Sequence, residues 1–130
     1  MLIYLLIVLL IVGNSIYAYK CIFQTEKYIE KYGFGEASAI MTRLVGTFAA
    51  GFAMTLAIAL LTSIEGAWLL FVYGFVQACM GSGVCYLTIH SRWGSVEGLK
   101  TSAEGYIAPA IVAVLNFLVL VTGWDVLFNI

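Results

Sequence analysis

Five polar side chains could do chemistry together, because each of them lies near the same end of a long apolar segment. They are Asn14, Arg43, His90, Arg92 and Glu104. If the apolar segments are helices of one bundle, these side chains form a polar layer that could hold a lipid headgroup, a quinone head or a small anion. The alternative is that both arginines extend to lipid phosphates and that the glutamate pairs locally or caps its helix.

The single histidine, His90, suggests a different chemistry. An imidazole can ligate a chlorophyll-type pigment or a haem, although a haem held by two histidines would need a second subunit. Tyr and Trp side chains near the ends of the apolar segments could also stack on a pigment or quinone, but such residues are typical of a membrane interface. We therefore predict lipid as the ligand and no cofactor, with pigment, haem or quinone as the alternative.

Gln77 and Asn116 are the deepest polar residues, each near the middle of an apolar segment. An amide at such a position usually forms a hydrogen bond between helices, a contact worth roughly 0.6–2 kcal/mol. Contact with a ligand is the alternative. The sequence contains no phosphate-binding loop, no His-Glu-x-x-His motif, no paired carboxylates and no Gly-x-Ser-x-Gly elbow. We therefore expect a protein that is not an enzyme.

The composition shows which elements must position these residues. The chain has 130 residues, of which 63% are hydrophobic and 10% charged. A soluble domain is roughly 45–50% apolar with about 25% charged residues, so this much apolar surface needs a lipid environment. The net charge of −1 argues against a nucleic-acid partner. Membrane lipids and other integral membrane subunits are the expected partners.

Four segments are long and apolar enough to span a bilayer, which takes about 20 residues. They cover approximately residues 2–19, 40–62, 67–89 and 103–124. The segments lack the alternation of a membrane β-strand. The first segment is not preceded by Lys or Arg, so we expect a retained helix rather than a cleaved signal peptide. The sequence predicts an all-α polytopic membrane protein of one domain, 1–130, with four transmembrane helices in an antiparallel bundle.

The basic residues predict how the chain is oriented. All six lie in or beside the first and third connections: Lys20, Lys27, Lys31, Arg43, Arg92 and Lys100. The positive-inside rule places these connections in the cytoplasm and both termini on the other side, in a bacterial inner membrane or an organellar equivalent. Residues 21–32 are amphipathic and predict a short helix at the membrane interface between spans one and two.

Small residues recur along spans two and three and predict close helix contacts. The stripe on span two is Gly46, Ala50, Ala53 and Ala57, and the stripe on span three is Gly74, Ala78, Gly81 and Cys85. Small residues let helix backbones approach closely in lipid. Because only residues 63–66 connect the two spans, we expect the stripes to pack against each other. The alternative is that one stripe faces another protein.

Three short stretches resemble the small four-helix DoxX-like membrane proteins. They are Tyr32-Gly33-Phe34-Gly35, Arg43-Leu44-Val45-Gly46 and Glu65-Gly66-Ala67-Trp68. The resemblance covers spans two to four loosely and implies a four-helix bundle. It assigns no catalytic residue, because that family is defined more by its architecture than by one shared reaction.

The sequence favours a non-catalytic integral membrane subunit that docks onto a larger membrane complex and stabilises it. A first alternative is a small redox or pigment-associated protein that uses His90. A second alternative is an oligomeric small-molecule transporter whose path is lined by Gln77, Asn116 and Arg43.

Overall fold

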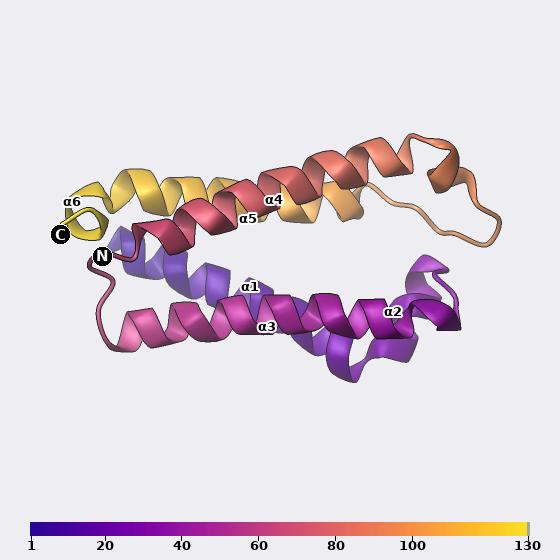
Figure 1. The fold of residues 1–130 in the computed structure, drawn as a ribbon, viewed down its shortest axis with the longest axis horizontal. Helices are drawn as coiled ribbons and strands as arrows, with labels where there is room; N and C mark the ends of the chain where they lie inside the picture. Colours follow the sequence, from indigo (N-terminus) through magenta and orange to yellow (C-terminus); the bar gives the residue numbers. More distant parts are fainter. Residues whose placement is uncertain (130) are drawn as a thin grey trace.

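The computed structural model describes residues 1–129, and this part of the chain folds entirely into helices and connections (Figure 1). The α-helices are α1 (Leu2–Phe23), α2 (Thr25–Tyr32), α3 (Ala39–Leu61), α4 (Trp68–Ile89), α5 (Glu104–Thr122) and α6 (Trp124–Leu127). Two short 3-10 helices are η1 (Glu36–Ser38) and η2 (Arg92–Ser95). Four of the helices, α1, α3, α4 and α5, are long and apolar enough to cross a membrane.

The observed helices lie close to the expected segments. The first one runs a full turn further than expected, to Phe23, before α2 begins at Thr25. Gly33 ends α2 with a φ of 67°, in the left-handed region that favours glycine. A Cβ at Gly33 would also collide with the carbonyl of Gly98, so α2 and the 96–103 connection meet at a position that only glycine fits.

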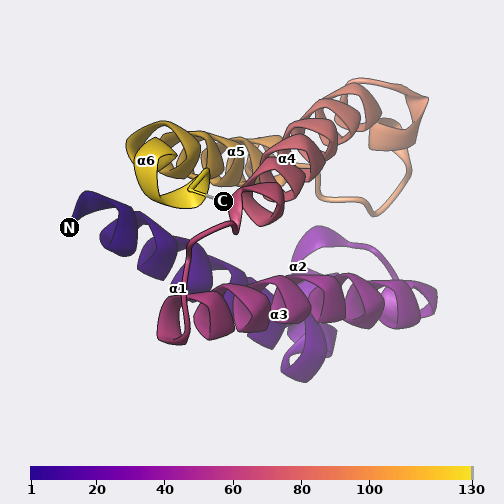
Figure 2. The same ribbon diagram turned by 60° about the vertical axis from the view of Figure 1, so that its left-hand side comes forward.

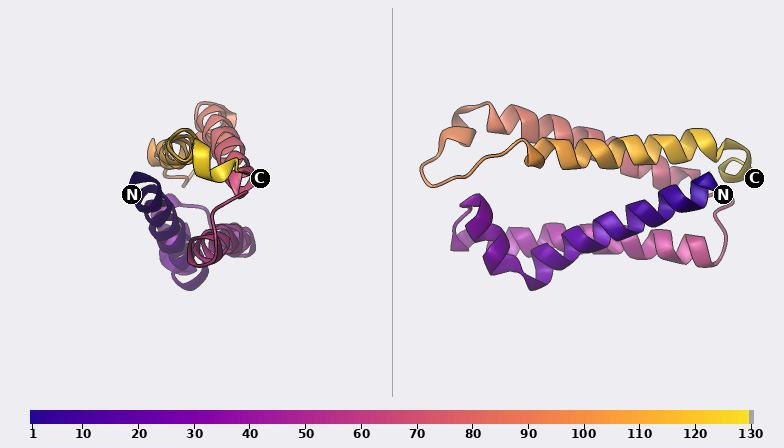
Figure 3. Two further views of the ribbon diagram at one scale, coloured as in Figure 1. Left: turned by 90° about the vertical axis from the view of Figure 1, so that its left-hand side faces the viewer. Right: turned by 180° about the vertical axis from the view of Figure 1, so that it is seen from behind.

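The four long helices associate as two pairs. Helix α1 packs along α3, and α4 packs along α5, while α1 and α5 share a smaller contact that joins the pairs. Figure 2 and the end-on view in Figure 3 show one pair above the other. Both termini and the α3–α4 connection lie at one end of the molecule, and α2 and the 90–103 connection lie at the other end (Figure 1).

The expected packing of α3 against α4 through their small residues is wrong. Helix α3 packs extensively on α1 and α4 on α5, so the two stripes do not form one seam between α3 and α4. A Cβ at Gly46 would lie 2.8 Å from the Cys21 Cβ of α1. A Cβ at Gly74 would lie 2.6 Å from Asn116 Oδ1 of α5 and 2.7 Å from Phe52 Cζ of α3. The Phe52 ring of α3 thus reaches α4 at Gly74, although the two helices share little other contact.

The apolar core lies at the end that holds the termini. It draws on α1, α3, α4, α5, α6 and the α3–α4 connection, and comprises Ile3, Leu6, Ile7, Leu10, Leu56, Ile64, Phe71, Val119 and Leu127. The outer faces of the long helices are apolar as well, with Ile40 78% and Leu61 84% exposed. A surface of this kind is matched to hydrocarbon rather than to water.

Candidate functional site

The five polar residues expected in one layer have separate partners. Arg43 donates from Nε to Thr25 Oγ1 over 3.1 Å, which ties the start of α3 to the start of α2. The Thr25 hydroxyl in turn donates to the Cys21 carbonyl over 2.7 Å. Asn14 donates from Nδ2 to the carbonyl of Leu10 in its own helix over 2.9 Å. Within residues 1–129, the five side chains form no hydrogen bond to one another.

Glu104 forms an ion pair outside the expected layer, and its partner, Lys31, lies 73 residues earlier in the chain, on α2. Its Oε2 lies 3.1 Å from Lys31 Nζ, and the two side chains are 55% and 58% exposed. Lys31 Nζ also lies 3.3 Å from the Tyr32 hydroxyl. The hydrogen bonds to Tyr32 and then to Glu104 raise the pKa of Lys31. An ion pair this exposed contributes little to stability, because water and salt screen it.

His90 lies where α4 ends and is held against two aromatic rings. Its Nδ1 lies 2.8 Å from the Tyr86 carbonyl. Its ring centroid is 4.3 Å from that of Tyr86 and 6.1 Å from that of Tyr106. When Nδ1 carries the proton and donates to this carbonyl, Nε2 is the acceptor and can bind a ligand. Arg92 lies over the neighbouring Trp93 ring at 4.7 Å, a cation–π contact.

The two deep amides lie in opposite environments. Asn116 is completely buried and donates from Nδ2 to the Val112 carbonyl over 2.9 Å, while its Oδ1 has no hydrogen-bond partner among the described residues. Gln77 is exposed on the outside of α4, and its amide has no side-chain hydrogen bond in the described chain. Within residues 1–129, neither amide forms the expected hydrogen bond between helices, because Asn116 bonds its own helix α5. The two amides also do not bond each other, and neither shares a hydrogen-bond network with Arg43.

An aromatic cluster, which the sequence showed only as interfacial residues, joins α1 to α2. The Tyr17 and Tyr28 rings meet edge to face at 6.1 Å, and the Tyr28 and Tyr32 centroids are 4.9 Å apart. Tyr32 stacks on Phe34 at 5.5 Å. Desolvation among these rings raises the pKa of the Tyr28 hydroxyl. The spacing of Tyr28 and Tyr32 by four residues is the one sequence signal that could have revealed part of this cluster.

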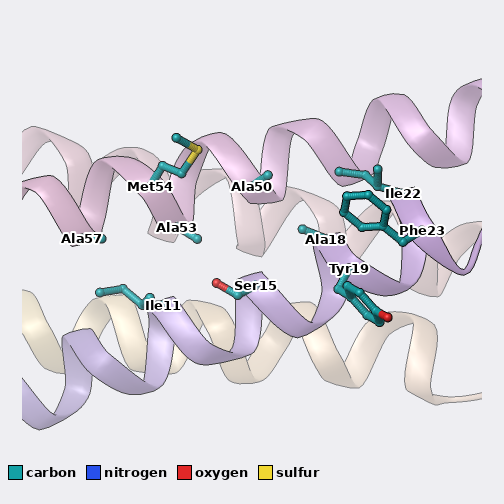
Figure 4. A pocket seen from close by; sticks show the side chains of 10 residues that line it. All are labelled: Ile11, Ser15, Ala18, Tyr19, Ile22, Phe23, Ala50, Ala53, Met54 and Ala57. Carbon is teal, nitrogen blue, oxygen red and sulfur yellow. The ribbon is translucent and has the colours of Figure 1, made fainter.

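Two shallow apolar grooves follow the helix pairs. The groove between α1 and α3 has a volume of about 350 Å³, and its small residues Ser15, Ala50, Ala53 and Ala57 leave the space open (Figure 4). The groove between α4 and α5 has a volume of about 440 Å³. At its edge the Ser82 hydroxyl donates to the Tyr106 carbonyl over 2.8 Å. Three residues of the predicted α3 stripe thus line a groove rather than contact α4.

A comparison of the chain with protein-family models, with curated proteins and with solved structures found no match.

Proposed function

We propose that the chain is a non-catalytic accessory subunit of a larger membrane protein complex. The observation that carries this proposal is the apolar outer surface of four helices that are long enough to cross a membrane. In lipid, such faces serve to contact acyl chains and the helices of neighbouring proteins.

The arrangement of the helix pairs supports this role. Because α3 and α4 share little contact, the pairs are joined chiefly through α1 and α5 and through the core at the termini. A partner helix can pack against a flank of either pair without displacing internal packing. The chain would then stabilise the complex or fill a gap in it.

In the membrane, α1, α3, α4 and α5 form an antiparallel four-helix bundle, and α2 lies at the interface. The aromatic cluster of Tyr17, Tyr28 and Tyr32 supports the position of α2, since tyrosine rings favour the level of the lipid headgroups. The α2 end lies in the cytoplasm and both termini lie on the opposite side. The positive-inside rule supports this orientation, because the basic residues lie in or beside the connections at the α2 end. A DoxX-like four-helix architecture remains part of this proposal.

Lipids are the ligands that fit this surface. The grooves along α1–α3 and α4–α5 are lined mainly by apolar side chains and suit acyl chains. Arg43 and Arg92 lie on elements at the α2 end, where each can extend to a lipid phosphate.

The accessory role is tested by gentle solubilisation of native membranes in a mild detergent, followed by affinity capture and sizing. We expect the chain to migrate in a complex of constant composition with other integral membrane proteins. A chain that migrates only as a monomer, or only with copies of itself, would contradict the role.

One observation favours a second candidate function, a redox or pigment-associated protein. The Tyr86 carbonyl fixes His90 through Nδ1, which is how histidine ligands are commonly oriented for metal binding through Nε2. Chlorophyll-type pigment or haem bound there would give a visible absorbance band in the purified protein. His90→Ala would abolish that band, and a colourless preparation would exclude both groups.

A further inference from the structure

We propose that the chain forms a symmetric dimer in the membrane, in which Gln77 of one copy bonds Gln77 of a second copy across two α4 helices. This inference rests on the membrane insertion described under the proposed function.

Gln77 is placed where its polar groups need a partner. It lies nine residues after Trp68 and twelve before Ile89, so it is near the middle of α4. At 1.5 Å per residue, roughly 14 Å of helix separates it from the nearer helix end. An exposed amide at this depth faces hydrocarbon, where hydrogen bonds with water are absent. Its two donors and its carbonyl oxygen therefore favour another polar group.

Other polar side chains on the outer faces are satisfied within their own helix. The exposed threonines each donate to a carbonyl three or four residues earlier: Thr47, Thr55, Thr62, Thr88 and Thr122. The Gln77 amide makes no such bond within residues 1–129. Gln77 therefore differs from these residues in keeping its hydrogen-bonding capacity free for a neighbour.

The face around Gln77 has the spacing of a helix–helix seam. Exposed residues recur at steps of four, three, four and three along α4: Tyr73, Gln77, Met80, Val84 and Leu87. This average of 3.5 residues keeps one side of a helix against a partner that crosses at a small angle. A single polar residue in such a seam fixes the register and the number of helices.

The outer face of α5 provides a contrast. It carries a similar exposed stripe that is entirely apolar: Ile107, Ile111, Val114, Leu118 and Val121. In lipid, an apolar stripe gains little by leaving acyl chains for another apolar surface. The outer face of α4 differs because it carries Gln77, whose amide can form hydrogen bonds with another protein but not with acyl chains.

A second copy of the chain is the partner that matches this face. Copies inserted in the same orientation have Gln77 at the same depth, so a two-fold axis along the membrane normal brings the two amides together. An amide is both donor and acceptor, so Nε2 of each copy can donate to Oε1 of the other. None of the seam residues is charged, so the two faces do not repel each other.

The test is energy transfer between donor-labelled and acceptor-labelled full-length chains in phosphatidylcholine vesicles at varied lipid-to-protein ratios. We expect the wild type to dimerise and Gln77→Leu to raise the dimer Kd roughly 3- to 30-fold, as loss of a membrane hydrogen bond would. Thr55→Val is the matched control, because its hydroxyl bonds the Gly51 carbonyl of its own helix. We expect no change in Kd for this control. A monomeric wild type, or a Gln77→Leu chain that dimerises as tightly, would overturn the proposal.

Cross-linking tests the same face independently of affinity. In a variant without the native cysteines, Met80→Cys should form a disulfide between copies, whereas Ile111→Cys on α5 should not. The reverse pattern would overturn the proposal. A wild type that is monomeric in vesicles but co-migrates with other membrane proteins would refute the dimer and leave the accessory role intact. A homodimer that captures no other membrane protein would support the dimer and contradict the accessory role.

Discussion

The two ends of the molecule are held together by different forces. At the end with the termini, buried apolar residues from α1, α3, α4, α5 and α6 pack into one core. At the α2 end, the pairs are linked by the exposed Lys31–Glu104 ion pair and by the 2.9 Å backbone bond from Lys100 N to Tyr32 O. Close packing of buried side chains holds the helices together at the end with the termini. The exposed polar contacts at the α2 end contribute little, because water and salt screen them. The stability of the molecule is therefore expected to reside mainly at the end with the termini.

The largest loss of stability is expected from Phe71→Ala, at the end with the core. Phe71 is completely buried and belongs to the apolar core, so the variant leaves a cavity within that core. Removal of a buried phenylalanine costs about 3–5 kcal/mol in soluble proteins, and we expect about 3 kcal/mol here, because lipid lowers the transfer contribution. Reversible unfolding in mixed micelles measures this cost. Leu69→Ala, at a site that is 62% exposed, is the control, and equal losses for the two variants would contradict a core at this end.

A smaller loss is expected where the pairs meet, for Gly74→Ala. The new Cβ would lie 2.6 Å from Asn116 Oδ1 and 2.7 Å from Phe52 Cζ, so these side chains must move. Overpacking of this kind costs about 1–3 kcal/mol. Gly83→Ala in the same helix has no atom within 4 Å of the new Cβ and should instead stabilise α4 by about 0.5–1 kcal/mol. The same unfolding assay distinguishes the two variants. Equal changes in their free energy of unfolding would argue against close packing at Gly74.

The smallest effect is expected at the α2 end, for Lys31→Ala. The pKa of Lys31 is raised by Tyr32 and Glu104, so any stabilisation is fully present below its unfolded pKa of about 10.4 and is lost as pH rises through the folded pKa. Lys31 stays protonated at roughly pH 6 to 9, well below its pKa, so the variant and the wild type should differ by a constant, near-zero amount across this range. A large loss in unfolding measurements, or one that varies across that range, would show that the polar links hold the pairs together.

The four long helices and the short amphipathic helix could be predicted from the sequence, because hydropathy alone determines which segments favour lipid. The partners of the helices could not. Gly46 and Gly74 were correctly expected to allow close approach, but a small residue does not specify which helix approaches it. Gly74 is approached both by Asn116 of α5 and by Phe52 of α3, and Phe52 lies outside both stripes.

The candidate site was less predictable than the fold. The positions of Asn14, Arg43 and Glu104 within their spans predict a similar depth in the membrane for all three. Depth does not determine the direction in which each side chain points. The partner of Glu104 is Lys31, 73 residues earlier in the chain, and their contact depends on the fold of the 90–103 connection. Asn14 and His90 form their hydrogen bonds with backbone carbonyls of their own helices. Such local bonds compete with the hydrogen bonds that would join the side chains into one polar layer.

The central claim, that the chain crosses a bilayer four times with both termini on one side, is tested most directly by labelling single cysteines in sealed membrane vesicles. In a variant without the native cysteines, Glu65→Cys lies in the α3–α4 connection and Glu97→Cys in the α4–α5 connection. A membrane-impermeant maleimide should label Glu97→Cys only from the cytoplasmic face and Glu65→Cys only from the opposite face. Labelling of both from the same face, or recovery of the chain in the soluble fraction, would contradict the account.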